Sequence, residues 1–126
     1  MPVRDVEGAV VAHLAAAGIA GVTRVGTEVP ADRPRHARFL VVRRVGGGGD
    51  ALVSRPAVRV SAYAESATEA ALLADAVELA MLSLPASDPF ISSVRTNRIY
   101  EAAWAGTATR DGSPCYEALF DLVANR

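Results

Sequence analysis

The sequence has no lysine, one cysteine and two histidines in 126 residues, and each shortage excludes a class of protein. The lone Cys115 cannot form a disulfide within the chain or build a cysteine-rich metal site, which suits a reducing compartment. All 13 basic residues are arginine, and the sequence contains 14 acidic residues, so its net charge is not that of a basic protein that coats nucleic acid. The apolar run at residues 9–22 is too short to span a bilayer and lacks the flanks of an export signal.

Sequence patterns typical of catalysis are also missing. The chain contains no nucleophile elbow, no paired histidines on a helix and no dinucleotide fingerprint after a strand. His13 has no second ligand at metal-binding spacing, and Cys115 has no histidine near it in sequence to activate it. We therefore expect no cofactor, no metal and no enzymatic activity. His13 is interpreted as a half-buried helix residue and Cys115 as a small packing residue.

What is present predicts one α+β domain over residues 1–126, with a four- to five-stranded antiparallel or mixed sheet packed against two main helices. Helical periodicity covers residues 3–17 and returns between Ser66 and Pro85. Alternation and turn residues predict strands at residues 22–29 (an edge strand), 37–45, 57–64, 98–108 and 115–123. The last two strands form a hairpin around a turn at 109–114, and Glu117 is placed on its solvent face.

A capping box marks the start of the second helix, since the Ser66 oxygen can accept the Glu69 amide while the glutamate reaches back. The apolar residues that share one arc of this helix are predicted to pack on the sheet: Ala70, Leu73, Ala74, Val77, Ala80, Met81 and Leu84. Three leucines lie outside that arc: Leu72, Leu79 and Leu82. Two interpretations stay open for them, scattered exposed leucine or a partner surface.

Charge is unevenly spread along the chain. Residues 24–59 carry eight arginines against three carboxylates, a net of +5, whereas residues 65–126 carry nine carboxylates against four arginines, a net of −5. Either folding mixes these charges into an ordinary surface, or the two segments form complementary faces between identical subunits. The candidate interface arginines are Arg33, Arg35, Arg38, Arg43, Arg44 and Arg59. A flexible loop is expected to follow at Gly46, Gly47, Gly48, Gly49 and Asp50.

Several patches, taken in order, carry a family resemblance. They are the run Val25–Pro34, the segment Phe39–Arg44 followed by Gly46 and Gly47, the strand Pro56–Ala64 before the helix at Ser66, and the closing turn and strand Gly112–Phe120. Together they resemble the tail terminator proteins of long-tailed phages and prophages of high-GC bacteria, over nearly the whole chain. Where that family often has a basic residue after the final-turn proline, this chain has Cys115.

The resemblance implies a structural protein of the virion, placed at the tail–neck junction after assembly in the host cytoplasm. Such proteins form a ring, usually of six copies, that docks on a completed tail tube, stops its polymerisation and presents a surface to the DNA-filled head. The implied partners are further copies of the chain, the major tail tube protein and a head–neck connector protein, with no membrane. In such a ring, the cationic and anionic segments would supply two matching surfaces, and the loop at 46–50 would order on meeting the tube or a neighbour.

Three alternatives accompany this hypothesis. The arginines could contact DNA in the lumen of the ring instead of a neighbouring subunit. The chain could be another ring protein of the same neck, for head closure or head–tail joining. More distantly, it could be a small-ligand-binding or enzymatic α+β dimer with Tyr63, Tyr100 and Trp104 lining a pocket.

Overall fold

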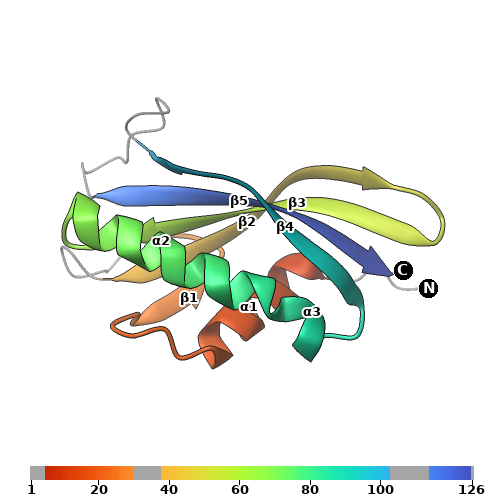
Figure 1. Cartoon of the computed structure of the whole chain (residues 1–126), viewed down its shortest axis with the longest axis horizontal. Helices are drawn as coiled ribbons and strands as arrows, with labels where there is room; N and C mark the ends of the chain where they lie inside the picture. Colours follow the sequence, from red (N-terminus) through yellow and green to blue (C-terminus); the bar gives the residue numbers. More distant parts are fainter. Residues whose placement is uncertain (1–4, 30–37, 103–113, 126) are drawn as a thin grey trace.

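Five strands form one mixed sheet in the computed structural model, which describes residues 5–29, 38–102 and 114–125 (Figure 1). The strands are β1 (Arg24–Gly26), β2 (Phe39–Gly49), β3 (Val53–Tyr63), β4 (Ile91–Glu101) and β5 (Cys115–Asn125). Their order is β1-β2-β3-β5-β4, with β1 parallel to β2 and every other neighbouring pair antiparallel. The predicted α+β class and the edge position of the first strand are confirmed, although β1 is shorter than predicted.

The helices α1 (Val6–Ala16), α2 (Ala67–Leu82) and α3 (Leu84–Ser87) cover one face of this sheet (Figure 1). Asp5 caps α1, because its Oδ1 accepts the Gly8 amide at 2.9 Å. Ser66 caps α2 as the sequence predicts, with its Oγ accepting the Glu69 amide at 3.1 Å. Pro85 lies in the first turn of α3, where its missing amide leaves no helical hydrogen bond unmade.

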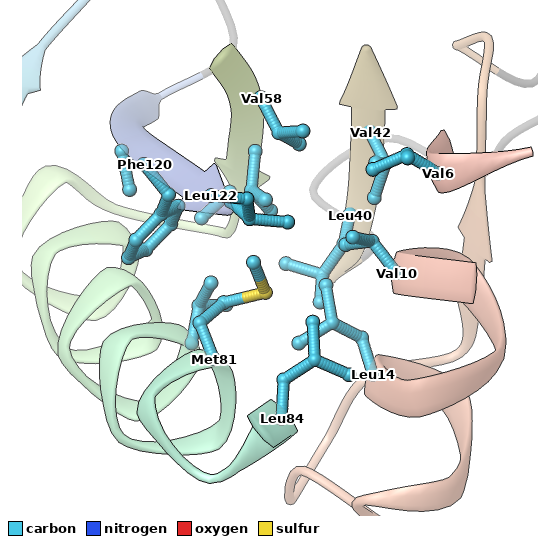
Figure 2. Packing of buried hydrophobic residues seen from close by; sticks show 14 of the residues in the cluster. Val6, Val10, Leu14, Leu40, Val42, Val58, Met81, Leu84, Phe120 and Leu122 are labelled. Atoms are coloured by element: carbon cyan, nitrogen blue, oxygen red, sulfur yellow. The ribbon is translucent and has the colours of Figure 1, made fainter. Parts of the chain in front are cut away.

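One apolar cluster fills the space between the helices and the sheet (Figure 2). From α1 it takes Val6, Val10 and Leu14, which face Leu40 and Val42 of β2. From the central strands it takes Val58, Val60, Ala62, Ala118, Phe120 and Leu122. The predicted packing stripe of α2 and α3 is confirmed, because all its members are buried except Ala80, which is partly buried: Ala70, Leu73, Ala74, Val77, Met81 and Leu84.

Strand β2 changes character half-way along its length. Phe39, Leu40, Val41 and Val42 are all buried, which confirms a strand that is apolar on both faces. From Arg43 onward the strand is exposed, yet it continues to pair with β3 as far as Gly49. One strand therefore serves first as core and then as surface.

The predicted flexible loop at Gly46–Gly49 is wrong, because these glycines form the end of β2 and face Ser54 to Ala57 of β3. The turn lies beyond them, where Asp50 Oδ1 accepts the amides of Leu52 and Val53 at 2.9 and 3.0 Å. Gly47 has a φ of 119°, and a side chain there would collide with the Arg55 carbonyl oxygen and Pro56. Glycine is needed here for a close approach of two strands, not for mobility.

The predicted strand at 98–108 is wrong in its start, since β4 begins at Ile91 and is described as far as Glu101. Four of its first six residues are polar, and two irregularities, near Ser93 and near Asn97, break the alternation from which a strand is predicted. β4 is also an edge strand, so it needs few apolar residues. The turn predicted at 109–114 lies almost wholly outside the described residues.

Candidate assembly interface

The arginines proposed as interface residues lie in three different settings, and Arg33 and Arg35 lie outside the described residues. Arg38 is held within its own subunit, where its guanidinium contacts the carboxylates of Glu65 and Glu69. Its Nη2 lies 3.1 Å from Glu65 Oε1, and these carboxylates raise the pKa of Arg38. This contact ties the start of β2 to the start of α2. Because both partners are carboxylates, the positive charge of Arg38 is already balanced inside the chain.

Arg59 is likewise paired within the subunit, on the sheet face opposite the helices. Its Nε lies 3.2 Å from Oε2 of Glu117, and that carboxylate also accepts a hydrogen bond from Ser61 Oγ at 3.2 Å. Among the described residues the buried Nε makes no hydrogen bond of good geometry, so the contact is chiefly one of charge. Glu117 is only 6% exposed, which corrects its predicted place on a solvent face.

Sequence reasoning missed Glu117 because its partners come from strands that are far away in the chain. The register places Val41, Ser61, Glu117 and Tyr100 in one row across β2, β3, β5 and β4. Directly opposed residues share a face, so the carboxylate of Glu117 lies between the side chains of Ser61 on one side and Tyr100 on the other. Burial, and next the charge of Glu117, raise the pKa of Tyr100.

Cys115 lies in the adjacent row, opposite Tyr63 of β3, whose ring stacks on Phe39 at 4.4 Å between centroids. Burial, with a smaller contribution from the Glu117 charge, raises the pKa of Cys115 to about 12. The thiol is therefore protonated at neutral pH, which agrees with a packing role. Tyr63 is held in this stack, and Trp104, the third residue of the hypothetical ligand pocket, lies outside the described residues.

Arg43 and Arg44 are exposed and are not matched with a carboxylate in the described part of the chain. The Arg43 Nη1 donates to the Thr27 carbonyl at 3.4 Å, and the Arg44 Nε donates to the Gly46 carbonyl at 3.3 Å. Both contacts use neutral oxygens, so both positive charges remain available to a partner. The backbone amide of Arg44 donates to Glu7 Oε2 at 2.6 Å, which fixes the strand at this point.

Beyond these two residues the β2–β3 hairpin extends past the helices at one end of the molecule (Figure 1). We name the segment from Arg43 to Arg55 the hairpin arm. It carries Arg43, Arg44 and Arg55 against Asp50, and its exposed apolar side chains are Val45 and Leu52, which is 78% exposed at the tip. Arg55 lies 3.9 Å from Asp50, so Arg43 and Arg44 are the arginines of the arm that form no ion pair with any residue that the structure describes.

The three leucines outside the buried arc of α2 are exposed as predicted. Leu72, Leu79 and Leu82 are 57%, 73% and 47% exposed. Thr68 and Asp75 are exposed on the same helix. Their positions alternate by four and three residues along α2, which places all five on one stripe: Thr68, Leu72, Asp75, Leu79 and Leu82. We name these five residues the helix stripe.

Other kinds of site find little support in the described ranges. They contain no group of three or more histidine, cysteine or acidic side chains arranged to hold a metal ion. None of their helices is both long and apolar enough to cross a membrane. His13 is half-buried as predicted, and its Nε2 donates to the Ala80 carbonyl at 2.7 Å, which joins α1 to the end of α2.

The family model for phage tail termination proteins matches residues 2–112. The chain belongs to this family. The resemblance inferred from sequence patches is thereby confirmed, and the tail termination protein is a structural component of a virion, not an enzyme.

A solved structure supports the same fold for the tail termination protein. The chain is similar to a chain from the virion of a native gene transfer agent particle, with a TM-score of 0.64 and 14% sequence identity. The match covers 96% of this chain and 95% of the other, so the shared fold extends over nearly the full length of both. No curated protein sequence matches the chain.

Proposed function

We propose that this tail termination protein forms a ring, of six copies, that caps the completed tail tube, stops its polymerisation and offers a surface for head joining. Its partners would be further copies of itself, the major tail tube protein and a head–neck connector protein. It would act at the tail–neck junction of the virion after assembly in the host cytoplasm. Family membership over residues 2–112 is the observation that carries this proposal.

The surface chemistry supports a ring of identical subunits. A closed ring needs two different surfaces on each subunit that match each other, because each copy meets two neighbours. The chain exposes a cationic hairpin arm and, on α2, an apolar stripe that contains one carboxylate. The contact residues that we propose are Arg43, Arg44, Leu72, Leu79 and Leu82, with the segment Gly46–Asp50 as the docking element. Arg33 and Arg35 stay predictions from the sequence, whereas Arg38 and Arg59 are engaged by carboxylates of their own subunit.

Two measurements on the purified full-length protein test this function. Electron microscopy, supported by analytical ultracentrifugation, should show a sixfold ring, alone or after addition of tail tube protein. In a tube assembly assay, sub-stoichiometric amounts of the protein should stop growth at the tube ends and shorten the mean tube length. A protein that stays monomeric at every concentration and salt, with and without tube protein, and leaves tube length unchanged would contradict the proposal.

The alternative to a subunit contact is that Arg43 and Arg44 bind DNA in the lumen of the ring. A channel through which DNA passes is poorly served by tight phosphate contacts, because each one adds salt-dependent affinity. Reversal of the charge at Arg43 and Arg44 separates the two uses. Loss of assembly with unchanged DNA retention on filters supports a protein interface, whereas intact assembly with altered DNA ejection supports the lumen.

A further inference from the structure

We propose that the hairpin arm of one subunit docks on the helix stripe of the next copy, with one of the two arginines Arg43 and Arg44, which lie on opposite faces of β2, placed against Asp75. This inference rests on the proposed ring and names the two surfaces that would join its subunits. The occupant of the helix stripe is thus a second copy of this chain. Three observations carry it: the position of Asp75, the free charges of the arm, and the placement of the two surfaces.

The first observation is a carboxylate in the middle of an apolar stripe. Asp75 lies between Leu72 and Leu79 on the exposed side of α2, and none of the described residues forms an ion pair with it. A partner that covers the leucines must also cover this charge, and burial of an unpaired carboxylate is costly. The occupant therefore has to bring a cation together with apolar side chains.

This requirement disfavours packing of α2 against α2 of another copy. The helix carries no arginine anywhere along its length, so two copies of the stripe would bury two Asp75 carboxylates without a cation from either helix. A two-fold contact through the stripes alone leaves both charges unbalanced. The complementary surface must come from another part of the neighbouring chain.

The hairpin arm has the complementary chemistry. The guanidinium groups of Arg43 and Arg44 are exposed and form no ion pair with a carboxylate of the described residues, and Val45 and Leu52 offer exposed apolar side chains within the same segment. Arginine suits such a contact because its planar guanidinium binds a carboxylate through two parallel hydrogen bonds. Apolar residues of the arm would cover the leucines while an arginine balances Asp75.

The placement of the two surfaces favours contact between copies over contact within one chain. The arm extends beyond the helices at one end of the long axis, whereas α2 begins at the other end (Figure 1). The helix stripe also faces away from the sheet, since the opposite side of α2 packs on it. Each subunit therefore presents one of the two surfaces to each neighbour, which is the condition for a head-to-tail ring.

Two complementary variants of the full-length protein test this pairing. Leu79→Glu blocks the stripe and leaves the arm intact, while the double substitution Arg43→Glu with Arg44→Glu blocks the arm and leaves the stripe intact. All three positions are exposed, so both variants should fold, which circular dichroism and thermal melting check. Arg95→Glu, a charge reversal at an 81% exposed arginine on β4, is the matched control.

We expect each blocked variant alone to self-associate at least tenfold more weakly than the wild type, and Arg95→Glu to behave as the wild type. An equimolar mixture of the two blocked variants should form one-to-one dimers and nothing larger, because only one intact arm can meet one intact stripe. Asp75→Arg combined with Arg43→Glu and Arg44→Glu should restore self-association to within about threefold of the wild type. Ultracentrifugation or mass photometry measures all of these.

The outcomes separate this inference from the ring itself. If the wild type forms rings and the arm variant forms them equally well, the arm–stripe contact is overturned while the ring stands. Rings by the arm variant that are lost in Leu79→Glu would assign the stripe to a contact that does not use the arm, which also overturns the inference. A wild type that never assembles, even with tube protein, overturns the proposed function and this contact with it.

Discussion

The two faces of the sheet are built on different chemistry. The face under the helices is apolar across its central strands, for example at Val58, Val60 and Phe120. On the opposite face, Ser61 and Glu117 are buried beside Arg59. A helix-covered face needs only apolar area, since the hydrophobic effect is non-directional, whereas a buried charge needs a particular partner at a particular distance. We therefore expect the first face to supply most of the stability, and the buried charge of the second to favour one particular pairing of strands.

Loss of a large side chain on the helix-covered face should lower the free energy of unfolding more than any other change considered for the two faces. Phe120 is completely buried, and Phe120→Ala should lower the free energy of unfolding by about 3–5 kcal/mol. The matched control is Leu79→Ala at a 73% exposed position, which should change it by less than about 0.5 kcal/mol. Urea denaturation followed by circular dichroism measures both, and equal losses for the two variants would contradict this account of the core.

Removal of the buried carboxylate on the opposite face should cost less. Glu117→Ala leaves Ser61 and Arg59 without their shared partner and should lower the free energy of unfolding by about 1–3 kcal/mol. The control is Asp121→Ala, because Asp121 is a more exposed carboxylate of the same strand, paired with Arg95 at 3.5 Å. That exposed pair should contribute at most about 1 kcal/mol. If Asp121→Ala proved the more destabilising, the opposite face would not depend on its buried charge.

The hairpin arm offers a test of whether its local stability can be separated from that of the rest of the sheet. Gly47→Ala places a side chain against the backbone of β3 at a φ of 119° and should cost about 1–3 kcal/mol of local stability. Hydrogen exchange should show the loss in the arm and not in β5. Gly48→Ala is the control, since a Cβ there meets nothing within 4 Å. Faster exchange throughout the sheet would show that the arm is part of the core.

The features that could be predicted from the sequence lie mostly on the helix-covered side of the sheet. The buried stripe of α2, the Ser66 cap and the apolar alternation of β3 could be predicted, because hydrophobic periodicity is local information. The buried Glu117 could not, because its burial depends on the pairing of β5 with β3 and β4. The glycines of β2 were misjudged for a related reason, since composition alone does not distinguish a mobile loop from a close approach of two strands.

The candidate interface shows a similar limit. The three exposed leucines could be found from the helical period, and so could Asp75, because its place between Leu72 and Leu79 follows from the spacing alone. What the sequence could not show is which arginines remain free. Arg38 and Arg59 are balanced within the subunit by carboxylates from β5, α2 and the turn before α2, whereas the guanidinium groups of Arg43 and Arg44 form no ion pair within the described part of the chain.

The smallest effect at neutral pH is expected at Cys115, where the opposite face responds to alkaline pH. The folded-state pKa of about 12 lies above the ordinary value of 9.0, so the folded chain holds this proton more tightly than the unfolded chain. The resulting stability is complete below pH 9 and is lost as the pH rises towards 12, by at most about 1.4 kcal/mol for each pH unit. The raised pKa of Tyr100 acts in the same direction at still higher pH, so the wild type must be compared with Cys115→Ala.

Urea denaturation at pH 8, 9, 10 and 11 measures the free energy of unfolding of both proteins. Plotted against pH, the two free energies should converge as the pH rises, because only the wild type loses the thiol contribution. Parallel curves would show that the fold tolerates the Cys115 thiolate, so that burial on this face does not exclude a charge at that position.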